Sequence, residues 1–168
     1  MPSPILNLDE VRLRGLDASE GSSPGAPAGY DVRWGDIATR IGARKLGYNL
    51  TVVAPGKRNC PFHNHRGIEE MFLILEGHGE LRYGEARHPL RPGDVIACPP
   101  GDANTAHQII NTGKTELRYL AVSTKDPMDI CEYPDSGKFS AYARSEDEPP
   151  HFRHIGRLDE THDYWEGE

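Results

Sequence analysis

Cysteine is scarce in this 168-residue sequence, and the three that occur are Cys60, Cys98 and Cys131. An odd number of cysteines without tight spacing argues against a disulfide framework and favours reduced thiols. The beginning of the sequence, MPSPILNLDE, also lacks the basic region and the long apolar region of a secretion signal. From these two absences we expect a cytoplasmic protein.

Long apolar runs and an excess of basic residues are missing as well. No run approaches the roughly 18 apolar residues of a membrane span, so we expect no membrane association. The 19 lysines and arginines are outnumbered by 26 aspartates and glutamates, which gives a formal charge of −7. Residues 145–168 hold eight of these acids and two arginines, so the rest of the chain is nearly neutral. Without a basic footprint, nucleic acid is not an expected partner.

Turn-forming residues, in contrast, are abundant. The sequence has 18 glycines and 14 prolines, more breakers than a helix bundle needs. Residues 19–29 are almost entirely Gly, Ser, Pro and Ala, which is typical of a flexible loop. After residue 45, short apolar stretches alternate with turn signals such as the hairpin pair Gly84-Glu85. The pattern predicts an all-β sandwich or barrel without a long helix.

Two of the predicted strands are apolar on both faces. Residues 70–76 place apolar side chains at odd and at even positions, and residues 117–122 do the same apart from Arg118. Successive residues of a strand point to opposite faces, and the interior of a small barrel covers only one face. We therefore expect a terminal arm or a second copy of the chain to cover the other face, and the second possibility predicts a homodimer.

The sharpest chemical signal is the segment His63-Asn64-His65. Residues two apart on a strand point the same way, so both imidazoles can reach one point in space. Glu70 begins an apolar strand, and His107 lies within another. Three imidazole nitrogens and one carboxylate suit Fe(II), Mn(II), Ni(II) or Zn(II). Taken singly, each residue also has an ordinary interpretation: a chance pair among eight histidines, a solvated carboxylate, a hydrogen-bonded core histidine.

The spacing around these residues resembles the first motif of the cupin superfamily, G(x)5HxH(x)3–4E(x)6G. The matching residues are Gly56, His63, His65, Glu70 and Gly77, with one residue more than the pattern in the leading gap. The last gap distinguishes two neighbouring acids. Gly77 follows six residues after Glu70, whereas the same spacing from Glu69 reaches Glu76. Glu70 is therefore the predicted ligand.

A second stretch resembles the other cupin motif, G(x)5PxG(x)2H(x)3N, with five residues instead of two before the histidine. Its matching residues are Gly93, Pro99, Gly101, His107 and Asn111. The resemblance implies a double-stranded β-helix barrel over residues 45–125, between an N-terminal arm (1–44) and a C-terminal extension with an acidic tail (126–168). It also implies one divalent transition metal in the barrel mouth. The implied ligands are His63, His65, Glu70 and His107.

A closer resemblance is to small bacterial single-domain cupins that carry a stretch like EYPDSGK, here residues 132–138. Such proteins are described provisionally as sugar-phosphate isomerases. The resemblance implies a metal-dependent enzyme whose partner is a small polar metabolite. An Fe(II)-dependent dioxygenase and a non-catalytic ligand-binding cupin stay open as alternatives, because one fold hosts many functions. Isomerisation would also need a base that the sequence does not place.

Three further residues are candidates for contact with the substrate. Arg66 flanks the metal motif, Arg118 is a charge on an otherwise apolar strand, and Tyr119 could line the cavity. A solvated rim, a structural ion pair and ordinary barrel packing are the alternative interpretations. Cys98 is expected to be a small buried apolar residue.

The acidic tail carries apolar residues that are unusual in a floating segment. We expect them to dock on a face of the barrel or on a partner, with the acids outward. These residues are Phe152, Ile155, Leu158 and Trp165.

Overall fold

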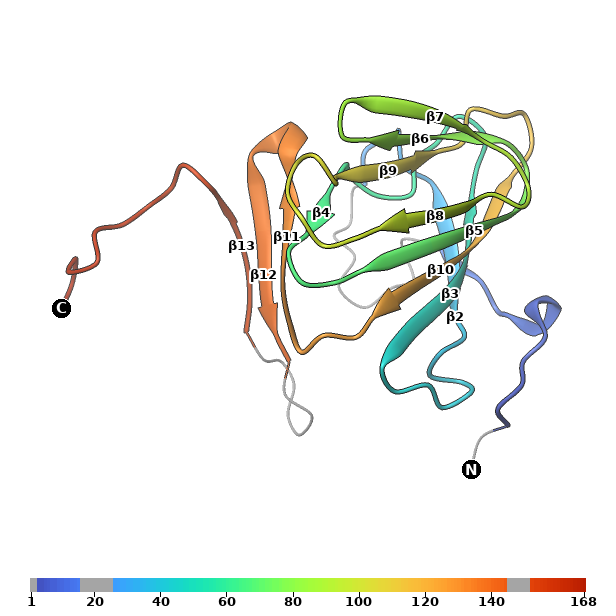
Figure 1. The fold of residues 1–168 in the computed structure, drawn as a ribbon, viewed down its shortest axis with the longest axis horizontal. Coiled ribbons are helices and arrows are strands. Elements are labelled where there is room, and N and C mark those ends of the chain that lie inside the picture. The colour runs from blue at the N-terminus through green and yellow to red at the C-terminus, as the bar shows by residue number, and fades with distance from the viewer. Residues whose placement is uncertain (1–2, 16–25, 145–151) are drawn as a thin grey trace.

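The computed structural model describes residues 3–15, 26–144 and 152–168, and residues 19–25 of the expected loop lie outside these ranges. Within them the regular structure is antiparallel β-strand apart from two short 3-10 turns, η1 (Leu8–Glu10) and η3 (Pro134–Ser136) (Figure 1). The strands are β1 (Arg14–Gly15), β2 (Val32–Asp36), β3 (Leu46–Val53), β4 (Asn64–His65), β5 (Glu70–Glu76), β6 (Gly79–Tyr83), β7 (Ala86–Leu90), β8 (Val95–Cys98), β9 (His107–Ile110), β10 (Leu117–Thr124), β11 (Met128–Tyr133), β12 (Lys138–Ala143) and β13 (Phe152–Arg157). The predicted all-β fold is confirmed.

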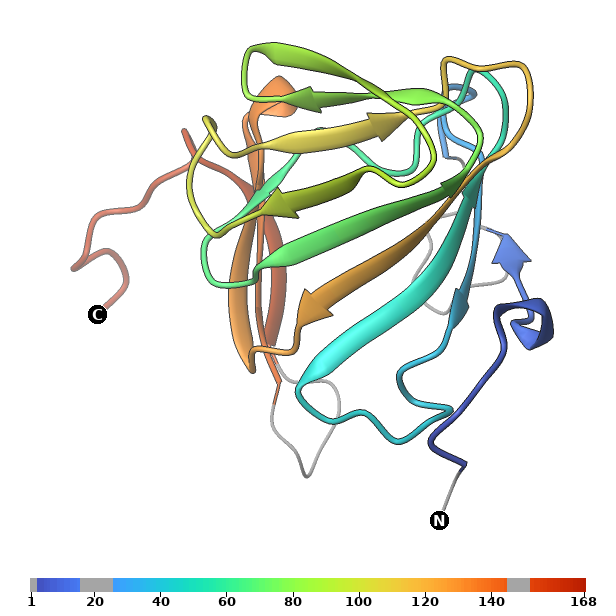
Figure 2. The ribbon, with the colours of Figure 1, turned by 45° about the vertical axis from the view of Figure 1, so that its right-hand side comes forward.

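The strands form three sheets. A six-stranded sheet has the order β1-β2-β3-β10-β5-β8, and a three-stranded sheet has the order β7-β6-β9. These two sheets curve around each other to form the barrel, as the turned view in Figure 2 shows. The third sheet, β13-β12-β11-β4, stands at one end of the barrel (Figure 1). The implied cupin-type barrel is therefore present.

The main core fills the space between the six-stranded and the three-stranded sheet. Phe72 and Ile74 of β5 project into it, and the ring of Tyr119 meets the ring of Phe72 edge-on at 5.7 Å. Cys98 lies in the same core and is 2% exposed. Burial raises the pKa of the Cys98 thiol to about 12, with a further contribution from the charge of Glu70. The thiol therefore stays protonated at neutral pH, and its expected role as a small buried apolar residue agrees with this environment.

The N-terminal arm covers the outer face of the six-stranded sheet. Val11 packs there with Ile37 and Leu50, and Leu75 of β5 and Leu120 of β10 join the same cluster. This arrangement explains why the two strands are apolar on both sides. The arm also contributes β1 and β2 to the sheet itself. The arm of the same chain therefore covers the outer face of this sheet, which was one of the two expected possibilities. The other possibility, a homodimer, stays a prediction.

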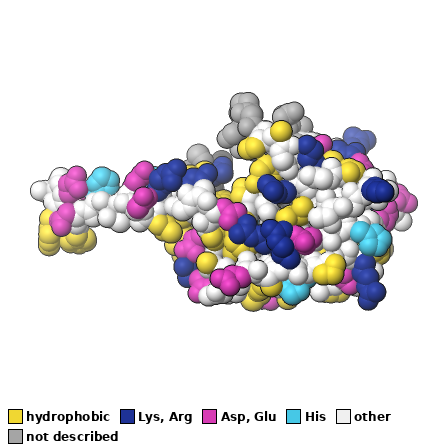
Figure 3. Space-filling view, turned by 90° about the horizontal axis from the view of Figure 1, so that it is seen from above, with side chains coloured by type: hydrophobic (Ala, Val, Ile, Leu, Met, Phe, Trp, Pro, Cys, Tyr) yellow, Lys and Arg dark blue, Asp and Glu magenta, His cyan; other side chains and the backbone are white. Residues whose placement is uncertain are grey.

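The first described part of the tail, β13, pairs with β12, and the residues after it run away from the body, with hydrophobic side chains at the far end (Figure 3). Phe152 and Ile155 on β13 are 60% and 54% exposed. Leu158 and Trp165 are exposed as well. These apolar residues do not dock on the barrel of their own chain, and docking on a partner stays a prediction. In the described part of the chain, no helix has the length and apolar character that crossing a membrane requires.

Candidate metal centre

The histidine pair sits where the barrel meets the third sheet. His63 forms an isolated antiparallel bridge with His107, whose amide donates to the carbonyl oxygen of His63 at 2.7 Å. His65 lies on β4, which pairs with β11. Between them, the buried amide of Asn64 points the other way and donates to Gly101 O at 3.1 Å and to Glu132 Oε2 at 2.9 Å. The alternation of the strand thus places both imidazoles on one side and an anchoring amide on the other.

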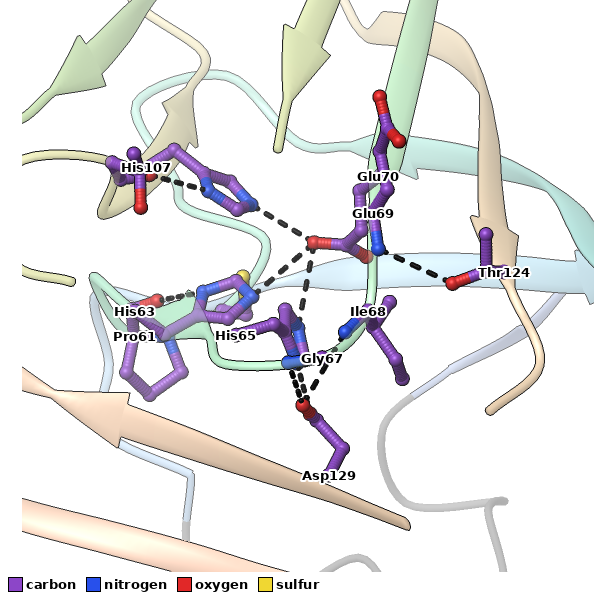
Figure 4. Close-up of polar contacts among 12 residues, drawn as sticks. Pro61, His63, His65, Gly67, Ile68, Glu69, Glu70, His107, Thr124 and Asp129 are labelled. Carbon is purple, nitrogen blue, oxygen red and sulfur yellow. Dashed lines mark hydrogen bonds and ion pairs between the residues drawn. The ribbon is translucent and has the colours of Figure 1, made fainter. Parts of the chain in front are cut away.

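Three imidazoles converge on the carboxylate of Glu70 (Figure 4). His107 Nε2 lies 2.9 Å from Glu70 Oε2. The Nε2 atoms of His65 and His63 lie 3.5 Å and 3.6 Å from the same oxygen. The structure therefore brings together all four residues that the cupin resemblance implies as metal ligands.

The opposite ring nitrogens are held by acceptors, which fixes the direction of each ring. Nδ1 of His63 lies 2.9 Å from Pro61 O, and Nδ1 of His107 lies 3.3 Å from Thr105 O. A carbonyl oxygen can only accept, so these Nδ1 atoms carry protons and the Nε2 lone pairs can face a cation. Nδ1 of His65 lies 2.5 Å from Asp129 Oδ2, a carboxylate that is fully buried.

Among the described residues, the ion-pair partners of the Glu70 carboxylate are the three imidazoles. Burial raises its pKa, but the hydrogen bonds and positive charges of the surrounding imidazoles lower it well below its ordinary value. Once a cation displaces the protons from Nε2, the ionised oxygen and the three Nε2 lone pairs form a donor set that fits a divalent transition metal. His63, Glu70 and His107 each offer a ligand atom within 4.8 Å of the others, so the residues are already clustered as a metal would require.

Two cavities meet at this cluster. One, of about 530 Å³, opens toward the third sheet and is bounded by His63 and His65 on one side and by Tyr133 and Tyr142 on another. The other, of about 370 Å³, reaches into the barrel past Glu70 and His107. His63 lines both. A cation at this junction would face space for a small molecule.

Comparison with known proteins bears on the barrel that holds these residues. Residues 49–123 match the family model described as the cupin domain. The barrel is a cupin domain. A solved structure of a sugar phosphate isomerase of the cupin superfamily from Silicibacter pomeroyi is 27% identical, with a TM-score of 0.76 over 93% of this chain and 94% of that chain. A structure from Acidithiobacillus ferrooxidans, provisionally named a sugar phosphate isomerase, is 22% identical with a TM-score of 0.75 over 96% of each chain, which shows a common fold.

The curated relatives match part of this chain. Auxin-binding protein 1 of Arabidopsis thaliana is 34% identical over 101 residues, which cover 56% of this chain and 50% of that protein. The chain spans about half the length of the curated relatives it matches.

The three expected substrate contacts lie outside the two cavities at the candidate metal centre. Arg66 pairs with Glu132 at 2.8 Å on the surface. Arg118 Nε lies 3.9 Å from Glu76 Oε1. Tyr119 is fully buried in the core, and its hydroxyl has no hydrogen-bond partner in the described ranges.

Residues that the sequence did not single out surround the histidines instead. Cys131 offers its sulfur within 4.8 Å of ligand atoms of His63 and His65, and Cys60 Sγ lies 3.6 Å from His63 Nδ1. The ring of Tyr133 lies 6.5 Å from that of His63. Burial raises the pKa of Tyr133, and the neighbouring Cys131 raises it further, so the hydroxyl keeps its proton at neutral pH.

Asp129, Cys131 and Tyr133 follow the period of two along β11 and therefore share one face of that strand. This alternation was visible in the sequence. What the sequence did not reveal is that β11 pairs with β4, because that pairing joins segments far apart in the chain.

Proposed function

We propose that this cupin holds one divalent transition metal on His63, His65, Glu70 and His107 and isomerises a small polar metabolite of the sugar-phosphate class. The observation that carries the proposal is the convergence of three Nε2 atoms on one carboxylate oxygen where two cavities meet. The similarity over almost the whole chain to the S. pomeroyi sugar phosphate isomerase supports the choice of reaction.

A metal at this site would supply a Lewis acid that polarises a substrate carbonyl and orients an adjacent hydroxyl. The chain's own residues orient the ligands and line the space for the substrate. Asp129 and the carbonyl oxygens of Pro61 and Thr105 hold protons on Nδ1, so that Nε2 faces the centre. The hydroxyl of Tyr133, which keeps its proton, lies on the cavity wall and would donate a hydrogen bond to an oxygen atom of the substrate.

The test combines metal analysis with activity assays on freshly purified protein. About one Zn or Mn ion per chain, together with aldose–ketose interconversion of a sugar phosphate, would support the proposal. About one Fe ion with oxygen uptake would indicate the dioxygenase instead. Tight ligand binding without turnover would indicate a non-catalytic cupin.

A pair of histidine variants shows whether the metal sits at the proposed place. His63→Ala should remove nearly all of the metal and the activity while changing the melting temperature of the metal-free protein little. His88→Ala is the matched control, because His88 lies exposed on β7 away from the centre. Full metal content in the His63→Ala variant would show that the ligand set is wrong.

A further inference from the structure

The third sheet builds a wall of the larger cavity that continues outward from the histidines. His65 on β4 pairs with Cys131 on β11, which in turn pairs with Ser140 on β12. Residues paired directly across an antiparallel sheet lie on the same face, so this row continues the face that carries His65. The side chains along it border the same cavity as the imidazoles.

The next row of this face leads to a positive charge. Asp129, which holds His65, pairs with Tyr142, and Tyr142 pairs with Arg153 on β13. Arg153 and Tyr142 both line the cavity. Arg153 is close enough to Tyr133 for its charge to act on that hydroxyl. The guanidinium thus belongs to the histidine-bearing face of the sheet.

A second guanidinium lines the same cavity. Arg144 follows β12, lines the same cavity, and has its Cζ atom 4.8 Å from the centre of the Tyr142 ring. In residues 3–15, 26–144 and 152–168, neither Arg144 nor Arg153 has a carboxylate at ion-pair distance. Arg66, Arg82 and other arginines of the protein, in contrast, do pair with acids.

We propose that Arg144 and Arg153 form an anion subsite that binds the phosphate group of a phosphate monoester. The other end of this ligand carries oxygen atoms that reach the proposed metal. This inference rests on the proposed function and specifies the substrate: a phosphorylated polyhydroxy compound bound at two ends. A guanidinium presents paired donors that match phosphate oxygens, and two of them suit a dianion. β13 lies three strand spacings from β4, roughly 14 Å, so a ligand several carbon atoms long fits between the subsite and the imidazoles.

The apolar part of the wall supports a small ligand with a charged end. Tyr133 and Tyr142 line the stretch between the histidines and the arginines, and Ser140 adds a hydroxyl. Their rings would pack against a carbon chain, while the hydroxyls can bond to its oxygens. The charged groups are thus placed at the two ends of the cavity.

The test measures binding of ribose 5-phosphate, ribose, inorganic phosphate and acetate by calorimetry to the metal-loaded protein. We expect ribose 5-phosphate to bind more tightly than ribose. Arg153→Gln and Arg144→Gln should each weaken ribose 5-phosphate binding about tenfold, with unchanged metal content and unchanged affinity for ribose. Both arginines are exposed, so the variants should fold. Arg91→Gln, at an exposed turn outside the cavity, is the matched control and should bind as the unmodified protein does.

Three results would overturn the subsite: unchanged ribose 5-phosphate affinity in the Arg144→Gln/Arg153→Gln double variant, the same loss in Arg91→Gln, or acetate binding as tightly as inorganic phosphate. Repeating the titration on chelator-treated protein separates the subsite from the proposed function. Phosphate binding that depends on the two arginines without any metal would support the subsite even if the isomerase proposal failed. Normal metal content with arginine-independent phosphate binding would remove the subsite and leave the metal proposal standing.

Discussion

His65 depends on a residue 64 positions further along the chain. Asp129 accepts from its Nδ1 and also from the backbone amide of Gly67 at 2.9 Å. One buried carboxylate therefore orients the imidazole and fixes the turn that leads from β4 to β5. Partners of this kind behind a ligating histidine set its tautomer and raise its basicity.

Asp129→Asn should weaken metal binding about 10- to 100-fold. The amide oxygen can still accept from Gly67, but the amide nitrogen would donate to Nδ1 of His65 and move the ring proton to Nε2, where the metal should bind. Competition with a chromophoric chelator measures the affinity, and the melting temperature of the metal-free protein reports any purely structural damage. Asp159→Asn in the exposed tail is the control. A metal affinity within twofold of the original would contradict this role.

The motif residues were predictable one by one because each position has a specific physical requirement that few residue types meet. Gly77 has a φ of +82°, and a Cβ there would overlap the carbonyl oxygen of Glu116. Asn111 is fully buried and donates to Val53 O and Thr115 O, both at 2.8 Å. Because such requirements restrict the residue type at fixed positions, the motif spacing can be recognised in a single sequence. Asp129 lies outside both motifs, and nothing in its neighbours along the chain indicates a histidine partner.

At the level of elements, the strands were predictable and their non-local pairing was not. β5 and the β6–β7 hairpin follow directly from apolar runs and turn residues. β4 is only two residues long and owes its conformation to β11, which arrives from far along the chain. The C-terminal extension, expected as an addition to the barrel, supplies three of the four strands of the third sheet.

The EYPDSGK segment fastens this sheet to the barrel. Asp135 receives two hydrogen bonds from Arg82 of β6, at 2.7 Å and 2.9 Å. The guanidinium of Arg82 also stacks 3.6 Å from the centre of the Phe62 ring, just before the histidine motif. The segment that marks the closer family resemblance thus has a structural role beside the candidate metal centre.

Deleting residues 145–168 should lower the melting temperature by about 5 °C, or 1–2 kcal/mol. The deletion removes β13 and its six paired positions on β12, leaving β12 as an unprotected edge. Deleting only residues 159–168 is the matched control, and it should change the melting temperature by no more than about 1 °C, because that part of the tail is exposed. Calorimetry compares the two. Equal shifts from both deletions would show that the tail, and not the strand, stabilises the protein.

In the whole molecule, the four candidate ligands connect all three sheets. His65 lies in the four-stranded sheet, Glu70 in the six-stranded sheet and His107 in the three-stranded sheet. A bound metal would therefore oppose separation of any one sheet from the others. The homodimer expected from the sequence would not depend on this metal site. Light scattering at micromolar concentration tests it by measuring the molar mass in solution.

Metal binding should stabilise the whole fold. At a free metal concentration one hundred times the Kd, the gain is about 2.7 kcal/mol. For a chain of this length that corresponds to a rise in melting temperature of roughly 5–10 °C. The gain should shrink as the pH falls, because protonated imidazoles do not bind metals. Thermal unfolding with and without Zn(II), Mn(II) or Fe(II) measures it. His107→Ala should show no such rise, and an equal rise in this variant would place the metal elsewhere.

The pairing of β4 with β11 has a consequence for anyone who trims the protein to its recognisable family region. A fragment comprising residues 49–123 would keep every motif residue but lose Asp129 and the strand against which His65 is laid. Such a fragment would retain the motif residues of the family without the strand and the carboxylate that orient His65. The smallest piece able to function is therefore longer than the piece that sequence comparison outlines.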